Sequence, residues 1–115
     1  MSAMFDENAL RQLTDNYVRD CFGLESSPRV SELASRLGMT PVQFTRTFRS
    51  VVGIVPSDYL KRQQIEFAKR LLIETDLSTT QIAYRAGFGT RATFFRLFRQ
   101  FERLTPRRYC EQLEG

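Results

Sequence analysis

The sequence carries one pattern twice, which restricts the chain to folds built from two similar units. Residues 33–38 match residues 82–87 at an offset of 49, and one inserted residue in the second copy then shifts the offset to 50. Both copies place a glycine at the same point, Gly38 and Gly87. The other matched pairs are Ala34 and Ala83, Thr40 and Thr90, Phe44 and Phe94, Arg46 and Arg96, Phe48 and Phe98, Arg49 and Arg99, Pro56 and Pro106, and Tyr59 and Tyr109.

Apolar residues recur at helical spacing along most of the chain, and the alternating runs typical of strands are nearly absent. We therefore predict an all-α fold. Glycines, and prolines in first turns, mark the helix boundaries. The first helix is expected to bury a face made of Leu10, Leu13, Tyr17, Val18 and Cys21. The expected helices cover residues 7–22, 30–37, 41–52, 56–74, 79–87, 91–101 and a last segment from residue 106.

Each copy consists of a short helix, a turn around a glycine and a second helix. Ala34 and Ala83 lie four positions before the glycine, where a small side chain lets two steeply crossing helices approach each other. This arrangement predicts a helix-turn-helix unit, whose second helix fits the major groove of DNA. A helical hairpin that only packs would show the same local pattern, but the duplication and the basic second helices favour DNA binding.

The second helix of each copy has one aromatic face and one basic face. The faces expected in the core contain Phe44, Phe48 and Val51 in the first copy and Phe94, Phe98 and Phe101 in the second. The faces expected to point outward contain Val42, Thr45, Arg46 and Arg49, and then Arg91, Ala92, Phe95, Arg96 and Arg99. Two interpretations of Phe95 remain open: contact with thymine methyl groups, or packing back against its own unit.

The charge is uneven along the chain. The net charge is +4, with −2 in residues 1–30 and +6 in residues 31–115, and arginine supplies fifteen of the seventeen basic residues. Arginine can bond a phosphate or a guanine edge with two parallel hydrogen bonds, which lysine cannot. A basic segment of this kind indicates a nucleic-acid partner, although many basic helical domains bind none.

Several other classes of protein lack support in the sequence. The chain has no histidine and only Cys21 and Cys110, so we expect free thiols, no metal site, no disulfide and no cofactor. No catalytic constellation is visible, so we do not expect an enzyme. Neither a signal peptide nor a membrane span is apparent, which predicts a soluble intracellular protein. A protein-interaction scaffold and an RNA-binding domain remain as alternatives, and DNA binding that weakens steeply with salt would separate the scaffold from the leading hypothesis.

The chain resembles the AraC/XylS family of bacterial transcription regulators over about residues 7–112. The most specific motif combines Ile82, Ala83, Gly87 and Phe88 with Phe94-Phe95-Arg96, Phe98-Arg99 and the later Thr105, Pro106 and Tyr109. The resemblance implies seven helices in two helix-turn-helix lobes joined by a long central helix. The expected divisions are a disordered or non-native N-terminus at 1–6, a first lobe at 7–55, the central helix at 56–74 and a second lobe at 75–115.

The resemblance also implies a set of DNA contacts. Base contacts are expected from Val42, Gln43, Thr45, Arg46, Arg91, Ala92, Phe95 and Arg96, and phosphate contacts from Thr40, Arg49, Lys61, Thr90 and Arg99. The chain departs from the family at Arg103, where a glycine is usual, although an arginine there suits the helix dipole. Ala92 and Phe95 lack hydrogen-bonding groups, so the second lobe is expected to specify bases less sharply.

The partners implied by the resemblance are double-stranded DNA and RNA polymerase. We expect a bacterial transcription regulator that works as an activator, in the cytoplasm and at the nucleoid. No segment is long enough for an effector or dimerisation domain, so we expect that domain to lie outside this chain.

Overall fold

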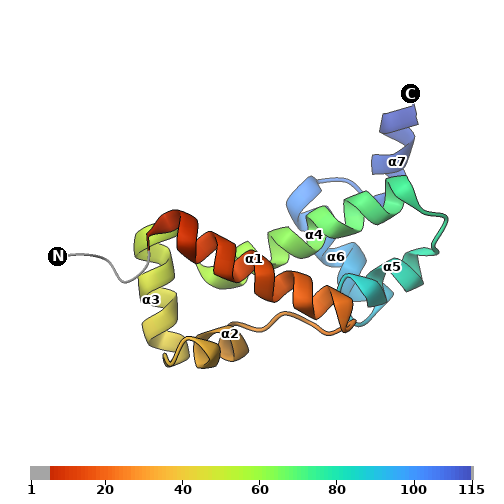
Figure 1. The fold of residues 1–115 in the computed structure, drawn as a ribbon. Helices are drawn as coiled ribbons and strands as arrows, with labels where there is room; N and C mark the ends of the chain where they lie inside the picture. Colours follow the sequence, from red (N-terminus) through yellow and green to blue (C-terminus); the bar gives the residue numbers. More distant parts are fainter. Residues whose placement is uncertain (1–5, 115) are drawn as a thin grey trace.

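The computed structural model describes residues 6–114, and within this range the chain forms seven α-helices without strands. The helices are α1 (Glu7–Gly23), α2 (Val30–Arg36), α3 (Pro41–Val52), α4 (Pro56–Glu74), α5 (Thr79–Arg85), α6 (Arg91–Glu102) and α7 (Pro106–Glu114). In Figure 1, α1 and α4 run along the length of the molecule, α3 lies towards one end and α5 and α7 towards the other. The prediction of an all-α fold with seven helices is confirmed.

The N-terminal extension expected at residues 1–6 lies outside the described residues except for Asp6. Asp6 is the N-cap of α1, because its Oδ1 accepts a hydrogen bond of 2.7 Å from the Ala9 N–H. A carboxylate at this position satisfies a backbone donor that the helix itself leaves unpaired.

Both helix-turn-helix turns are closed in the same way. In each copy, the N–H of the second residue after the helix C-cap donates to an alanine carbonyl: Met39 to Ala34 and Phe88 to Ala83, each at 2.9 Å. This ending requires a left-handed residue between the helix and the donor. Gly38 and Gly87 provide it with φ angles of +70° and +82°. The glycine turn predicted from the repeat is therefore present twice.

Three aromatic rings form the same cluster in each copy. The successive ring centroids are 5.5 and 5.3 Å apart in Phe44, Phe48 and Tyr59, and 5.7 and 5.6 Å apart in Phe94, Phe98 and Tyr109. The four phenylalanines are fully buried, and such tilted and edge-to-face contacts stabilise aromatic packing beyond the burial of area alone. Each second helix is thereby attached by its aromatic face to the helix that follows it.

The central helix α4 contributes to two hydrophobic cores. Tyr59 and Leu60 belong to the first core, which α4 shares with α1, α2 and α3. Ile65 and Ala68 belong to the second core, which also contains residues of α5 and α6 and packs against Tyr109 of α7. Because α4 is continuous over its 19 residues, it joins the two cores without a break.

Three expected core positions differ from the prediction, and one of them is Val51 of α3, which is only half-buried. In α1, Leu13 is 39% exposed and Thr14 takes the core position, where its Oγ1 donates to the Leu10 carbonyl at 2.8 Å. That bond satisfies the hydroxyl, so a threonine can be buried there without a stranded polar group. In α6, Phe101 is only half-buried, and Leu97, with 6% exposure, completes the core stripe with Phe94 and Phe98.

The loop between α1 and α2 packs against the second copy. The Ser27 hydroxyl donates to the Gly87 carbonyl, and Glu25 forms an ion pair of 3.7 Å with Arg85. Next to these contacts, the Phe22 and Phe67 rings stack with centroids 4.2 Å apart. Gln64 of α4 completes the set with a hydrogen bond to the Ala86 carbonyl. We call these contacts the core junction, and they fix the first copy against the second.

Candidate nucleic-acid interface

The helix α3 presents a basic outer face that begins at a well-formed N-terminus. Thr40 Oγ1 accepts from the Gln43 N–H at 3.1 Å, and Gln43 Oε1 accepts from the Thr40 N–H at 3.0 Å. This reciprocal capping box, with Pro41 in the first turn, fixes where the helix starts. Two of the predicted DNA contacts, Thr40 and Gln43, thus also cap α3.

The remaining predicted residues of α3 lie on the face opposite Phe44 and Phe48. Val42 is 68% exposed, Arg46 and Arg49 are exposed, and Thr45 is half-buried at the edge of this face. Val42 therefore adds one apolar side chain to a face that is otherwise polar and basic.

The helix α6 repeats this arrangement. Thr90 caps it by accepting from the Thr93 N–H at 3.1 Å, and Arg91, Ala92, Arg96 and Arg99 are exposed. The helix ends at Arg103, which has a φ of +62° and occupies the place that Gly53 has in α3, with a φ of +96°. The departure from the family glycine therefore leaves the helix ending unchanged but puts an arginine in a left-handed conformation.

The structure bears on one of the two interpretations of Phe95, its packing against the second unit, and contact with thymine methyl groups stays a prediction. The Phe95 ring is half-buried and packs edge-on against Phe94, with centroids 5.8 Å apart, so part of it folds back onto the second core. The rest of the ring remains at the outer surface, where the Arg91 guanidinium lies over it.

A shallow open depression follows each second helix on its outer face. Thr45, Arg46, Arg49 and Ser50 line the depression on α3, and Phe95, Arg96, Arg99 and Gln100 line the one on α6. These are the same four positions of the repeat. Both copies therefore expose the same four positions of the repeat around a shallow depression, and two of the four in each copy are predicted base contacts.

The electrostatics of both copies are one-sided. The 25 residues from Leu33 to Ser57 contain no Asp or Glu, and neither do the 25 from Leu77 to Phe101. Within the described part of the chain, none of the ion pairs involves Arg46, Arg49, Arg96 or Arg99. Four arginines are therefore exposed without a carboxylate partner, which is the charge pattern that a polyanion would neutralise.

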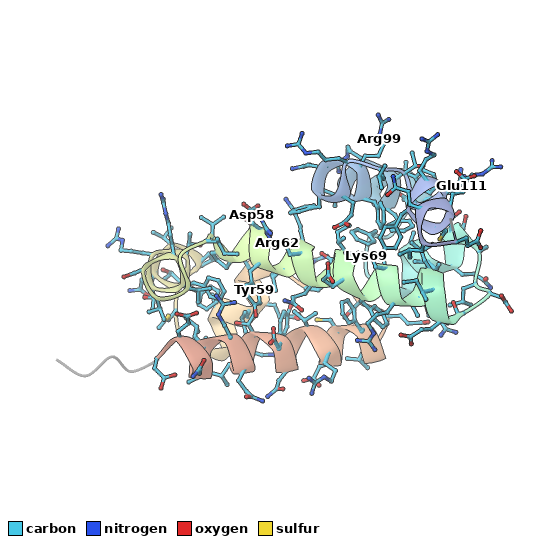
Figure 2. All side chains as sticks on the ribbon, turned by 90° about the horizontal axis from the view of Figure 1, so that it is seen from above. Asp58, Tyr59, Arg62, Lys69, Arg99 and Glu111 are labelled. Atoms are coloured by element: carbon cyan, nitrogen blue, oxygen red, sulfur yellow. The ribbon has the colours of Figure 1, made fainter. Side chains whose placement is uncertain are left out.

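A further arginine, which the sequence reasoning missed, lies between the two second helices. Figure 2 shows Arg62 on the side of α4 that faces α6, whereas Tyr59 points towards α1. The Arg62 guanidinium lies 5.6 Å from the centroid of the Phe101 ring. The predicted phosphate contact Lys61 is the preceding residue and is half-buried. Helical periodicity could have indicated Arg62, because it places this residue on the exposed face of α4 while Leu60 and Ile65 fall on the buried side.

Over residues 6–114, no group of three or more histidine, cysteine, aspartate or glutamate side chains is placed to hold a metal ion. Cys110 is a free thiol, and burial raises its pKa, which makes the thiolate less available. None of the described helices is long and apolar enough to cross a membrane.

Fold and surface together define a double helix-turn-helix protein in which two basic second helices share one chain. A model of the helix-turn-helix domain family matches residues 33–112, which covers both copies. The chain belongs to the AraC-type helix-turn-helix family of transcription regulators, a family of regulators and not of enzymes.

Among curated relatives, the probable transcriptional regulator LumQ of Photobacterium leiognathi is 32% identical over 110 residues, which is 92% of this chain and 44% of LumQ. An HTH-type transcriptional regulator of Mycobacterium tuberculosis is 42% identical over 81 residues, 70% of this chain and 31% of that protein. The chain thus spans less than half the length of these relatives.

Solved structures show the same arrangement. The DNA-binding domain of AdpA, a global transcriptional factor solved in complex with a target DNA, is 31% identical with a TM-score of 0.72, covering 84% of this chain and 87% of that one. The C-terminal domain of AraT, a response regulator from Geobacillus stearothermophilus, is 25% identical with a TM-score of 0.81, covering 96% and 88%.

Proposed function

We propose that this chain binds double-stranded DNA in a sequence-specific way and inserts α3 and α6 into two neighbouring segments of the major groove. The observation that carries the proposal is the repeated outer face, on which the exposed Arg46 and Arg49 occupy the positions that Arg96 and Arg99 have in the second helix-turn-helix unit. The AdpA domain, a structural relative, was solved with its target DNA and supports this assignment.

In this proposal, Val42, Gln43, Thr45 and Arg46 contact bases in the first DNA segment. Arg91, Ala92, Phe95 and Arg96 contact bases in the second, where fewer polar groups are available. Thr40, Arg49, Lys61, Thr90 and Arg99 contact phosphates, and Arg62 adds a phosphate contact between the two segments. Phosphate contacts supply affinity and orientation, and base contacts supply sequence preference.

The dimensions of the molecule fit two adjacent segments on one face of the duplex. The 19 residues of α4 span about 28 Å at 1.5 Å per residue, and the molecule is 51 Å long. Successive major-groove segments on one face are about 34 Å apart. A single chain should therefore bind two unlike half-sites about ten base pairs apart. Because α4 is shorter than the distance between the groove segments, we expect a modest bend of the duplex.

We propose that the domain acts together with a second domain that senses a signal or dimerises. The support is the greater length of the curated relatives and the description of the AraT fragment as the C-terminal domain of a response regulator. Activation through RNA polymerase, and a cytoplasmic site of action at the nucleoid, follow from the family and complete the proposal.

Selection of bound duplexes from a random pool tests the function directly. We expect one bipartite site, bound with an affinity that falls steeply as salt increases. Inserting five base pairs between the half-sites turns the second one to the opposite face, so affinity should fall to that of one half-site. A chain that selected no sequence, that preferred RNA, or that ignored the insertion would contradict the proposal.

A further inference from the structure

Arg91 and Phe95 form a stacked pair on the outer face of α6. They are one helical turn apart, and the Arg91 guanidinium carbon lies 4.4 Å from the centroid of the Phe95 ring. The equivalent positions of the first copy are Pro41 and Thr45, which cannot form such a pair. The two outer faces therefore differ here although the backbones around them repeat.

Arg91 is also held from its other side. Its Nε donates a hydrogen bond of 3.0 Å to Oγ1 of Thr79, the first residue of α5. With Nε engaged, the two terminal nitrogens keep their donors. Those nitrogens are the ones that can bond guanine O6 and N7 together when an arginine approaches a base edge end-on. Because the side chain is held before DNA arrives, less rotamer freedom is lost on binding.

The Phe95 ring offers an apolar surface next to this guanidinium. One face of the ring lies under Arg91, and the ring packs edge-on against Phe94. The remaining surface borders the depression that Arg96, Arg99, Gln100 and Thr105 also line. An aromatic surface that lines an open depression suits the methyl group of thymine, the one apolar feature of the major-groove edge.

We propose that the Arg91–Phe95 pair makes the second half-site depend on a guanine and on the methyl group of a neighbouring thymine. Arg91 bonds the guanine, and Phe95 both positions the guanidinium and contacts the methyl group. Thr79 acts as a second positioning residue for Arg91. This inference rests on the proposed function and assigns a role in specificity to Phe95, a predicted base contact that has no hydrogen-bonding group.

Deoxyuridine substitution isolates the methyl group. The site recovered by selection is synthesised with each dT of the second half-site replaced in turn by dU, and affinities are measured by fluorescence anisotropy. One replacement should weaken binding about fourfold, the effect expected for one buried methyl group. The Phe95→Ala variant should bind this dU duplex no more weakly than it binds the dT duplex. A dU placed outside both half-sites serves as the control.

Three variants separate contact from positioning. Arg91→Lys keeps the charge and should reduce the guanine preference about tenfold. Phe95→Leu keeps an apolar side chain without the ring face, so the guanine preference should fall about twofold to fivefold while sensitivity to dU remains. Thr79→Val removes the acceptor for Nε and should reduce the guanine preference as well. Thermal melting followed by circular dichroism shows that each variant is folded.

Binding that is indifferent to every dU replacement would overturn the methyl contact. Equal weakening by Arg91→Lys on duplexes with and without the guanine would reduce Arg91 to a phosphate contact and overturn the pair. Both results leave sequence-specific binding intact, since the wild-type chain would still select its site. Failure of the proposed function appears earlier, as the absence of any selected site.

Discussion

The side-chain amide of Gln64 donates a hydrogen bond of 3.0 Å from Nε2 to the backbone carbonyl of Ala86. Gln64 lies in the middle of α4 and is only 6% exposed, and Ala86, directly after α5, is fully buried. The bond joins the central helix to the turn of the second copy, at the centre of the core junction. A buried carbonyl that loses its donor destabilises the fold by its full desolvation penalty.

Replacing Gln64 by methionine should therefore lower the free energy of unfolding by about 1–3 kcal/mol. Methionine keeps the length of the side chain but cannot donate to the Ala86 carbonyl. Urea denaturation measures the effect, with the exposed Gln100→Met as a control that should stay within about 0.5 kcal/mol of the wild type. Equal midpoints for both variants would show that the Ala86 carbonyl does not depend on Gln64.

Gly38 and Gly87 form a matched pair for measuring the packing at the core junction. Both have a positive φ, so alanine at either position should cost about 1 kcal/mol through the backbone. A Cβ at Gly38 would meet open space, but one at Gly87 would lie 3.1 Å from the Ser26 carbonyl oxygen and 3.2 Å from Pro28 Cδ. Gly87→Ala should thus lose about 1–3 kcal/mol more than Gly38→Ala in the same urea titration. Equal losses would mean that the loop between α1 and α2 can move away from the added Cβ without measurable cost.

Arg103 offers a stabilising substitution. Its φ of +62° is a left-handed conformation that glycine adopts without strain, as Gly53 does at the matched position. Arg103→Gly should raise the free energy of unfolding by about 0.5–1 kcal/mol, and Gly53→Arg should lower it by a similar amount. Differential scanning calorimetry gives both values. A destabilised Arg103→Gly variant would indicate that the arginine side chain stabilises the helix end by more than its backbone strain.

Arg46 is the clearest candidate for a base contact in the first copy, since it is exposed in the depression on α3 and forms no ion pair within the described residues. Arg46→Ala should weaken binding to the selected site by about 1–3 kcal/mol and relax the preference at one base pair. Arg49→Ala is the matched control, because a phosphate contact should weaken all duplexes alike and reduce the salt slope by about one. Equal weakening of cognate and scrambled DNA by Arg46→Ala would assign Arg46 to the backbone instead.

The repeat explains how much of the fold the sequence could predict. Helix boundaries depend on local chemistry, which the sequence shows directly. Thr40 with Pro41 marks the start of α3, and Gly38 and Gly87 mark the turns after α2 and α5. The expected central helix at 56–74 has the same bounds as α4. Matched positions such as Phe48 and Phe98 also predicted which face of each second helix would be buried.

Features that depend on tertiary packing were not predictable in this way. Thr14 rather than Leu13 enters the first core because the direction of α1 is set by α3 and α4, not by the hydrophobicity of α1 alone. The core junction joins Ser27 to Gly87, sixty positions apart, and no periodicity connects them. The stacking of Arg91 on Phe95 is likewise invisible to a pattern that classes one residue as polar and the other as apolar.

The continuity of α4 limits how this domain can be controlled. Tyr59 belongs to the first core, Gln64 to the core junction and Ile65 to the second core, so every turn of the middle of the helix is held by packing. The middle of α4 therefore offers no break at which the two helix-turn-helix units could hinge. An incoming signal is therefore expected to expose, cover or turn the domain as one rigid body, and not to switch it by changing the spacing between α3 and α6.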